Sequence, residues 1–597
     1  MSSYEDEKLG KIYDSSLIRQ LVPYIKPYLK QAALAIFCLL VASLCMLSRP
    51  KLIQVGIDDY IAQGDLTGLR FITGIFISIL LIGFFARYAQ MYLMEWIGQR
   101  IMLDLRERIF SHLQHLSLTF FNRNPVGYLM TRVTSDVQAL NELFTSGLVA
   151  IFGDIVTLIG IFILLFIMNW KLAAIIMIVL PLLFMATIIF KQKVRISFRM
   201  IRTRIAKINA NMQENIAGMT IVQLFNRQKK NYAHFENLNR DHLEAFLNTI
   251  FYFAIFYPLI EVIQALTTAL IIWYGGMNII QQQLSFGELV AFLQYAIMFY
   301  RPINDLSEKF NILQQAMAAS ERIFKLLDNE FEEGYATNGK HHRTIKGKID
   351  FSEVWFAYKK EEWVLRDVSF SIEPGEKIAI VGATGAGKST IINLLGRFYN
   401  VQKGHINIDG RHINDYSLVE LRRQTGIVLQ DVFLFAGSII DNIRLGDTSI
   451  SDETVYQAAR DVSADSFIND LPGQYNHVLQ ERGTTLSVGQ RQLLAFARAL
   501  AFNPAILVLD EATSSVDTET EILIQKALKR LMANRTSIII AHRISTIQDV
   551  DKIIVMHKGK IREMGSHAQL LAAGDIYSRL YQLQFAAPQV PRTDPAP

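Results

Sequence analysis

One stretch in the second half of the chain has the residue types and spacing of a phosphate-binding loop. An apolar run, 378–381, leads into GATGAGKST at 382–390, and a helical pattern follows. Glycines let backbone N–H groups turn inward around phosphates at the start of a helix. Lys388 would reach the β- and γ-phosphates, and Ser389 would offer a hydroxyl to Mg²⁺. The loop residues expected to bind ATP are Gly382, Thr384, Gly385, Gly387, Lys388, Ser389 and Thr390.

A pair of carboxylates supplies the second half of this chemistry. The run ILVLDE at 506–511 reads as a buried strand with Asp510 and Glu511 at its end. Beside a phosphate loop, Asp510 would hold Mg²⁺, and Glu511 would orient or deprotonate the attacking water. The short β-rich runs and helices from about residue 349 onward predict an α/β domain around both motifs.

The composition shows that this domain is only part of the protein. Among 597 residues, 51% are hydrophobic and only 19% are charged, and the mean hydropathy is +0.22. A soluble chain would carry about a quarter charged residues, and the apolar excess lies in the first half. The net charge of +5 and the absence of a Lys/Arg run give no support for nucleic-acid binding. The two cysteines share one apolar segment, which gives neither a disulfide framework nor a metal site.

Apolar stretches in the first half predict an all-α membrane domain with six spans. A crossing needs about 20 largely apolar residues. The first and last candidates reach that length only with their flanks. The candidates are 31–47, 71–86, 148–168, 172–190, 251–276 and 289–300.

Charge in the connections predicts the orientation. The segment between the fourth and fifth spans is rich in Lys and Arg, whereas 169–171 is minimal and 279–285 is uncharged. The positive-inside rule therefore places the basic loops, both termini and the α/β domain in the cytoplasm. These loops, about 95–146 and 191–246, read as long helical extensions that would contact a soluble domain.

Two ionisable residues in or beside the predicted spans are candidates for a functional role. Glu261 is in the fifth span and Arg87 is in the inner part of the second. A charge at membrane depth must face protein or water, so both are candidates for substrate contact. The alternatives are a structural hydrogen bond between helices and, for Arg87, an interfacial position.

Further motifs give the second half a close resemblance to the nucleotide-binding domain of ATP-binding cassette (ABC) transporters. The stretch LSVGQ at 486–490 resembles the signature LSGGQ, which precedes a helix and separates this family from other phosphate-loop ATPases. In the family, the N-terminus of that helix faces the ATP of the opposite domain. The resemblance therefore places Ser487 and Gly489 at the γ-phosphate of a second cassette, and it implies that Gln490 also binds ATP.

Several other residues match individual motif positions of the ABC cassette. Tyr358 matches the aromatic residue that stacks on adenine, and Gln430 matches the glutamine that reaches Mg²⁺ and water. Asp517 matches the loop that crosses the dimer interface, and His542 matches the histidine that contacts the γ-phosphate. ERG at 481–483 matches a segment that senses the membrane domain in exporters. Glu511, His542 and Gln430 are thus the expected catalytic residues, and Ser389, Gln430 and Asp510 are the expected metal ligands.

The resemblance extends over essentially the whole chain. Six spans followed by one cassette is the half-transporter arrangement of ABC exporters, and the chain looks closest to the bacterial multidrug MdlB-like group. The expected domains are a transmembrane domain at 1–328, a linker at 329–348, the cassette at 349–583 and a disordered Pro-rich tail at 584–597.

Val488 stands where most family members have glycine in the signature. A valine adds bulk and β-branched stiffness where the nucleotide would approach. One interpretation is that this signature completes a weakened ATP site in a partner chain, while Glu511 keeps this chain's own site active. A heterodimer is therefore favoured over a homodimer with a tolerated variant.

The resemblance implies export of hydrophobic or amphipathic substrates across the bacterial cytoplasmic (inner) membrane, driven by ATP with Mg²⁺. A dimer of half-transporters would alternate between inward- and outward-facing states in the lipid bilayer. A lipid or lipid-linked flippase would share the same ATPase. A regulatory or ATP-gated subunit with little turnover is a further alternative. Such a subunit would tolerate the loss of Glu511, so the presence of Glu511 argues against it.

Overall fold

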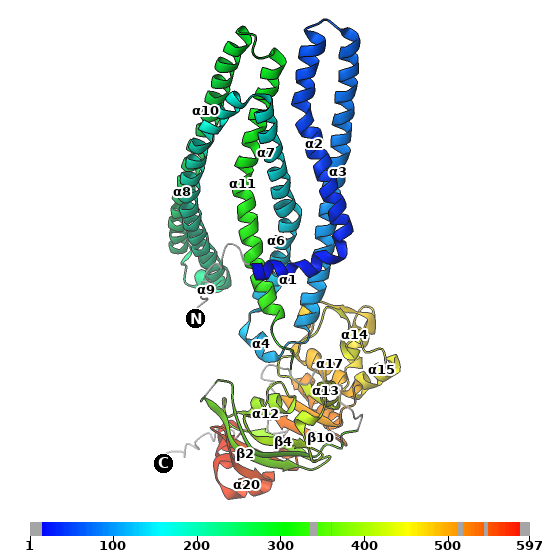
Figure 1. Cartoon of the computed structure of the whole chain (residues 1–597). Helices are drawn as coiled ribbons and strands as arrows, with labels where there is room; N and C mark the ends of the chain where they lie inside the picture. Colours follow the sequence, from blue (N-terminus) through cyan, green and yellow to red (C-terminus); the bar gives the residue numbers. More distant parts are fainter. Residues whose placement is uncertain (1–14, 333–343, 360, 511–517, 542–546, 586–597) are drawn as a thin grey trace. The chain divides into compact units, whose positions relative to one another are not determined.

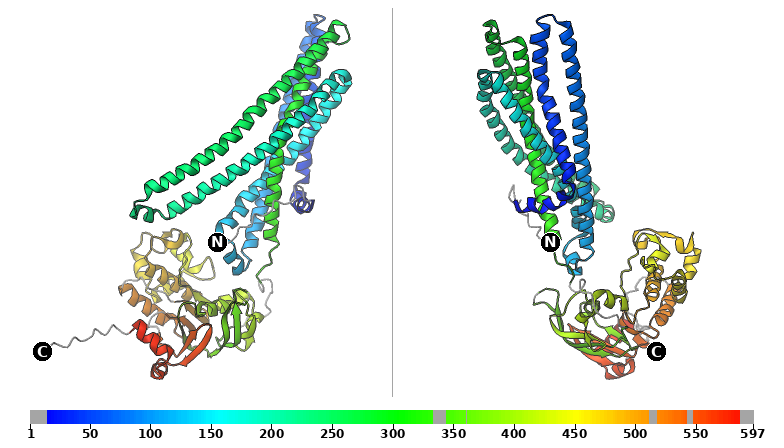
Figure 2. Two further views of the ribbon diagram at one scale, coloured as in Figure 1. Left: turned by 90° about the vertical axis from the view of Figure 1, so that its left-hand side faces the viewer. Right: turned by 45° about the vertical axis from the view of Figure 1, so that its right-hand side comes forward.

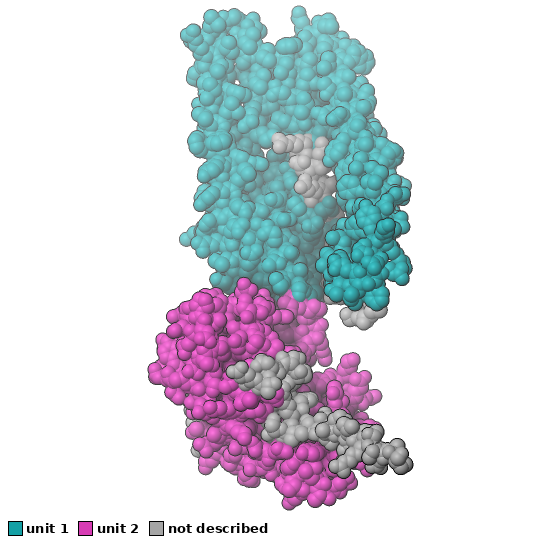
Figure 3. All heavy atoms as spheres, turned by 180° about the vertical axis from the view of Figure 1, so that it is seen from behind, with its two compact units in different colours: residues 1–111, 127–329 teal, residues 112–126, 330–597 magenta. Residues whose placement is uncertain are grey.

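A computed structural model describes residues 15–332, 344–359, 361–510, 518–541 and 547–585. The chain forms two compact units, shown in Figure 3. The first comprises 1–111 and 127–329, and the second comprises 112–126 and 330–597. The segment 112–126, from the predicted first cytoplasmic loop, therefore packs as part of the second unit.

The first unit is built from very long helices, as Figure 1 shows. An α-helix rises 1.5 Å per residue, so the 53 residues of α10 extend over about 80 Å, far beyond an apolar core of about 30 Å. Helices α8 and α10 lie side by side along their length in Figure 1 and Figure 2. The helices are α1 (Ser15–Ile25), α2 (Leu29–Val55), α3 (Leu66–Leu113), α5 (Val126–Thr131), α6 (Val137–Glu142), α7 (Val149–Met168), α8 (Trp170–Ala217), α9 (Met219–Leu224), α10 (Gln228–Ile280) and α11 (Phe286–Leu327).

The predicted spans correspond to these helices. Five helical stretches in the described residues are long and apolar enough to cross a membrane, and a shorter apolar stretch, Phe286–Tyr300, opens α11. The fold class predicted from the sequence, a helical membrane domain followed by an α/β cassette, is confirmed. The five long stretches are Arg19–Ile61, Leu66–Leu113, Val126–Met168, Trp170–Ala217 and Gln228–Ile280.

A core of apolar side chains packs α2, α7, α8, α10 and α11 together. Its buried tyrosines satisfy their hydroxyls internally, as burial requires. Tyr295 donates to the backbone oxygen of Leu47 at 2.6 Å, and Tyr300 donates to Thr267 Oγ1 at 2.8 Å. These bonds fix α11 against α2 and α10.

The second unit contains a six-stranded sheet in the order β12-β11-β3-β10-β9-β6. All neighbours from β11 to β6 are parallel, and only β12 is antiparallel. Buried parallel strands are continuously apolar, as in IAIV, ILVL and SIII. The strands are β3 (Lys377–Val381), β6 (Thr425–Val428), β9 (Ile506–Asp510), β10 (Thr536–Ile540), β11 (Lys552–His557) and β12 (Lys560–Gly565).

Two smaller sheets and a set of helices complete this unit. A four-stranded antiparallel sheet has the order β2-β1-β4-β5, and β7 pairs with β8. The remaining strands are β1 (Ile349–Ala357), β2 (Trp363–Ile372), β4 (Lys403–Ile408), β5 (Arg411–His412), β7 (Gly437–Ser438) and β8 (Val478–Leu479). The helices are α4 (Leu118–Arg123), α12 (Lys388–Leu395), α13 (Leu418–Gln424), α14 (Ile439–Arg444), α15 (Asp452–Asp461), α16 (Asp465–Asp470), α17 (Val488–Ala501), α18 (Thr518–Leu531), α20 (His567–Ala573) and α21 (Ile576–Phe585).

Candidate nucleotide site

Strand register gathers the phosphate loop, Gln430 and Asp510 at one edge of the six-stranded sheet. Ile380 of β3 pairs with Ile540, and Ile540 pairs with Asp510. On the other side of β9, Leu509 pairs with Val428, two residues before Gln430. Parallel strands present their carboxyl ends at the same edge, where ligands bind in open α/β sheets.

The backbone of the phosphate loop requires glycine at two positions in particular. Gly382 has φ +155°, and a Cβ there would lie 2.3 Å from the carbonyl oxygen of Met556. Gly387 has φ +101° at the N-cap of α12, and its Cβ would lie 2.7 Å from Leu365 Cδ2. The positive φ strains any side chain at either position, and at Gly382 the backbone of Met556 also leaves no room for one, so these glycines fix the course of the loop.

Lys388 is folded back onto this loop. Its side-chain ammonium donates to the carbonyl oxygens of Gly382 at 2.7 Å and Ala383 at 3.2 Å, and the residue is only 7% exposed. Burial lowers the pKa of Lys388, and the nearby Asp510 carboxylate partly opposes that shift. A buried ammonium held by carbonyl dipoles beside a helix N-terminus is suited to an anionic ligand.

The residues that follow Lys388 divide between the surface and the interior. Ser389 is exposed and Thr390 is buried. The described residues contain no group of three or more His, Cys, Asp or Glu that would hold a metal by themselves. Mg²⁺ in phosphate sites uses one or two protein ligands together with the phosphates and water. A hydroxyl at Ser389 and a carboxylate at Asp510 fit that demand.

Tyr358 follows β1 and leaves part of its side chain open to solvent. Its exposed fraction is 40%, and its hydroxyl donates to Thr390 Oγ1 at 3.2 Å. Phe356 packs edge-on against it, with ring centroids 4.8 Å apart. This is a restrained aromatic side chain beside the phosphate-loop helix, a suitable place for a base to stack.

The signature stretch begins helix α17. Ser487 is the N-cap, and a capping box joins it to Gln490: the Gln490 amide donates to Ser487 Oγ at 3.2 Å, and the Ser487 amide donates to Gln490 Oε1 at 2.9 Å. Gly489 is buried while Ser487 is exposed. The N–H groups of the first turn have no partner within the helix, so this exposed helix start can receive an anion.

Val488 is the first residue of α17, and its side chain is 45% exposed. Its φ is not among the positive values found in the described chain, so the valine adopts an ordinary backbone conformation. The fold therefore accommodates valine here, and its bulk is presented outward at the helix start.

Three expected site residues lie outside the described residues: Glu511, Asp517 and His542. The described chain reaches Asp510 at the end of β9 and Ala541 directly after β10.

In the membrane unit, Glu261 on α10 and Arg87 on α3 are both exposed in the single chain. Sequence reasoning missed an ion pair between two helices: Lys309 on α11 bonds Asp154 on α7, and both side chains are largely buried. The carboxylate within the apolar run VAIFGDIVTL was the available signal, since a charge there needs a partner.

Comparison with known proteins agrees with this architecture. The family described as ABC transporter transmembrane region matches residues 32–303, and the family described as ABC transporter matches 365–514. An uncharacterized ABC transporter ATP-binding protein of Bacillus subtilis, YknV, is 41% identical over 97% of this chain and 96% of its own length.

Two further relatives have names that describe a function. A Bacillus subtilis protein named "Probable multidrug resistance ABC transporter ATP-binding/permease protein YheH" is 38% identical over 87% of this chain and 78% of its own length. An ATP-dependent lipid A-core flippase of Syntrophus aciditrophicus is 37% identical over 96% of this chain and 95% of its own length. The chain belongs to the ABC transporter family. It is a multi-pass membrane half-transporter of the exporter type, with an ATPase coupled to transport.

Proposed function

We propose that this chain exports hydrophobic or amphipathic compounds across the bacterial cytoplasmic membrane as one half of a dimeric exporter. The observation that carries the proposal is a cassette with a buried loop lysine and a capped signature helix, joined in one chain to apolar helices of membrane-spanning length. The relative named for multidrug resistance supports this substrate class.

Each site residue has its own role in ATP binding and hydrolysis. Tyr358 stacks on adenine, and the phosphate loop from Gly382 to Thr390 binds the phosphates. Mg²⁺, when bound, neutralises phosphate charge, and Ser389, Gln430 and Asp510 are the residues that would hold it. Glu511 orients or deprotonates the attacking water, and His542 contacts the γ-phosphate. Glu261 and Arg87 are candidate contacts for the transported compound.

Two chains are needed because the exposed start of α17 serves the partner's nucleotide. Ser487, Gly489 and Gln490 present this helix start, and Asp517 belongs to the loop at the interface. We favour a heterodimer, since Val488 adds bulk that a weakened partner site would tolerate. ATP binding then favours one membrane state over the other, and hydrolysis with product release resets the cycle.

A lipid or lipid-linked flippase is the second candidate. The relative named as a lipid A-core flippase matches nearly the whole chain, including the membrane unit. A flippase would use the same ATPase and differ only in its cargo. A regulatory subunit with little turnover is a weaker alternative, because the chain has Glu511 where a base is needed.

ATPase turnover of the chain purified alone in lipid, beside its Glu511→Gln variant, tests the proposal. Loss of a general base reduces the rate by about 10²- to 10⁴-fold, so a working homodimer would lose essentially all activity in the variant. Near-zero turnover of well-folded wild-type protein that binds ATP would support the heterodimer, to be followed by co-expression with candidate partner chains. Turnover that survives Glu511→Gln would contradict the catalytic assignment.

Stimulation of that turnover separates the two cargo classes. Amphipathic drugs should raise the ATPase rate of an exporter of small compounds. Stimulation by lipid A-type lipids, with no response to drugs, would favour the flippase.

A further inference from the structure

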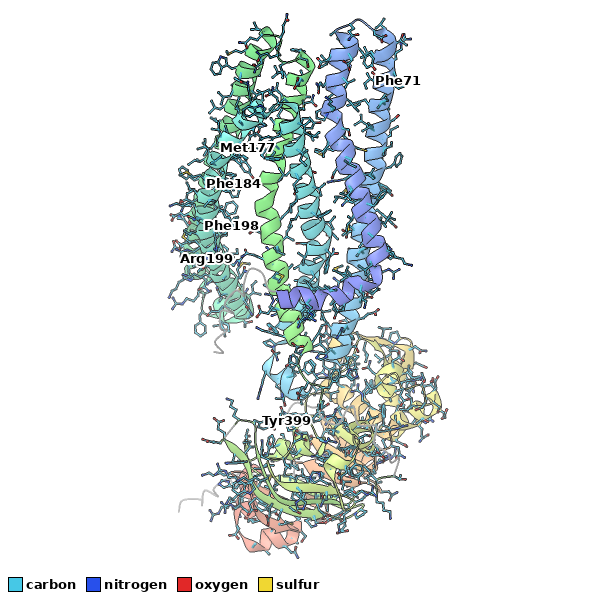
Figure 4. All side chains as sticks on the ribbon, in the orientation of Figure 1. Phe71, Met177, Phe184, Phe198, Arg199 and Tyr399 are labelled. Atoms are coloured by element: carbon cyan, nitrogen blue, oxygen red, sulfur yellow. The ribbon has the colours of Figure 1, made fainter. Side chains whose placement is uncertain are left out.

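Tyr399 lies just after the phosphate-loop helix α12, and Figure 4 marks it on the cassette. Its ring meets the ring of Tyr358 edge-on, with centroids 5.0 Å apart and planes at 89°. It also packs against Phe356 at 5.7 Å. The three rings form a cluster that restrains Tyr358 from the side.

The hydroxyl of Tyr399 connects this cluster to another part of the chain. Asn122 Nδ2, on helix α4, donates to Tyr399 Oη at 2.8 Å. Helix α4 belongs to the segment 112–126, which packs in the same compact unit as the cassette although 277 residues separate the two partners. One hydrogen bond therefore joins the first cytoplasmic loop to a ring that touches Tyr358.

Tyr358 is also tied directly to α12. Its hydroxyl donates to Thr390 Oγ1 and accepts from Asn393 Nδ2 at 3.1 Å. Hydrogen bonds therefore hold the hydroxyl of Tyr358, and neighbouring rings hold its ring in one orientation. The 40% of the side chain that remains exposed is the surface available to a ligand. A base that stacks on that surface meets a pre-organised partner, which lowers the entropic cost of binding.

A second connection joins the C-terminal end of α12 to the same segment. Arg422 donates to the carbonyl oxygens of Gly396 and Arg397 at the end of α12, and its guanidinium also makes two bonds to the Glu332 carboxylate, at 2.6 and 3.0 Å. The Glu332 amide in turn donates to the carbonyl oxygen of His115, within the segment 112–126. The segment 112–126 is therefore linked at two places to the residues that directly follow α12.

We propose that Tyr399 is a positioning residue for nucleotide binding, which holds the Tyr358 ring in its stacking orientation and ties it through Asn122 to helix α4. The proposal rests on the proposed function, in which Tyr358 stacks on adenine. Movement of α4 during transport would then alter the restraint on Tyr358, and nucleotide affinity would respond to the membrane unit through Asn122.

Equilibrium binding of the fluorescent analogue TNP-ATP to the full chain in lipid, with displacement by ATP, tests this without requiring turnover or a partner chain. Tyr358→Ala should weaken binding about tenfold or more, the effect of a lost stacking surface. Tyr399→Ala should weaken it about threefold to tenfold, the range that an edge-to-face pair supports. Tyr399→Phe keeps the ring and removes only the hydroxyl, so it should weaken binding less than Tyr399→Ala does.

The hydrogen bond is tested with a double-mutant cycle. Asn122→Ala and Tyr399→Phe remove the same bond, so each should weaken ATP binding by a similar factor of about two to three. The double variant should be no weaker than either single variant. Additive effects would show that Asn122 does not act through Tyr399 and would overturn that part of the proposal.

Tyr475→Ala is the matched control. Tyr475 makes a comparable ring contact with Tyr456, at 4.6 Å, elsewhere in the cassette, and its loss should leave ATP affinity unchanged. If Tyr399→Ala matches this control while Tyr358→Ala weakens binding, Tyr399 is not a positioning residue. If Tyr358→Ala itself has no effect, the adenine-stacking role is wrong, and that failure is distinguishable from the first.

Discussion

At the scale of single residues, nucleotide binding depends on the environment of the Lys388 ammonium group. Lys388 is buried, and loop carbonyl oxygens accept its hydrogen bonds. Burial favours the neutral amine and lowers its pKa, while the phosphates of a bound nucleotide would favour the ammonium and raise it. Nucleotide binding is therefore linked to protonation of this side chain.

This linkage predicts the pH dependence of ATP affinity. Because binding raises the pKa of Lys388, a proton is taken up on binding wherever the free protein has lost it. Affinity should therefore be constant at lower pH and fall as pH rises through the lowered pKa of Lys388, at a pH below the usual lysine range near 10.4. Titration calorimetry from about pH 7 to pH 10 would measure this decline.

Lys388→Arg is the control, because arginine stays protonated throughout that range. Its affinity for ATP should be weaker than that of the wild type but independent of pH. An equal decline in both proteins would assign the effect to another group.

At the scale of elements, a buried carboxylate forms ion pairs that join two segments far apart in the chain. Asp136 lies in the helical turn 132–136 that precedes α6. Its Oδ1 forms a salt bridge of 2.5 Å with the guanidinium of Arg322 on α11, and its carboxylate also pairs with Arg132. Asp136 and Arg132 are both buried. Removing one partner of such a group leaves an uncompensated charge, which is costly.

Asp136→Ala should therefore lower the stability of the membrane unit by on the order of 3–5 kcal/mol, measured as a reduced midpoint of denaturation in lipid. Asp241→Ala provides the comparison: its pair with Arg204 is exposed, with 46% and 39% of the side chains accessible. Such pairs contribute about 0–1 kcal/mol. Similar losses for the two variants would show that Asp136 is not a structural junction.

At the scale of the whole molecule, the long helices are long enough both to cross a membrane and to extend out of it. Helices of about 70–80 Å cross an apolar core of about 30 Å and continue well beyond it. The charge of the connections predicts that these extensions, including α9, lie on the cytoplasmic side, and that the turn between α10 and α11 lies outside.

Single cysteines would test this topology. Gln282→Cys should react with a membrane-impermeant maleimide in intact cells, whereas Asn226→Cys should react only after permeabilisation. Cys38 and Cys45 are first replaced by alanine, so that the introduced thiol is the only target. The reverse pattern would invert the predicted orientation.

The sequence by itself determined the architecture and the identity of the nucleotide motifs. Apolar length marks a span, and glycines before a lysine mark a phosphate loop, because both signals are local. The ion pair of Asp154 with Lys309, the bond from Asn122 to Tyr399 and the salt bridge of Glu332 with Arg422 could not be read in this way. Each joins residues far apart in the chain, and only the tertiary packing that involves α7, α11, α4 and α13 brings them together. Val488 shows the same division: the sequence marks it as unusual, but its exposed position at the start of α17 is a property of the fold.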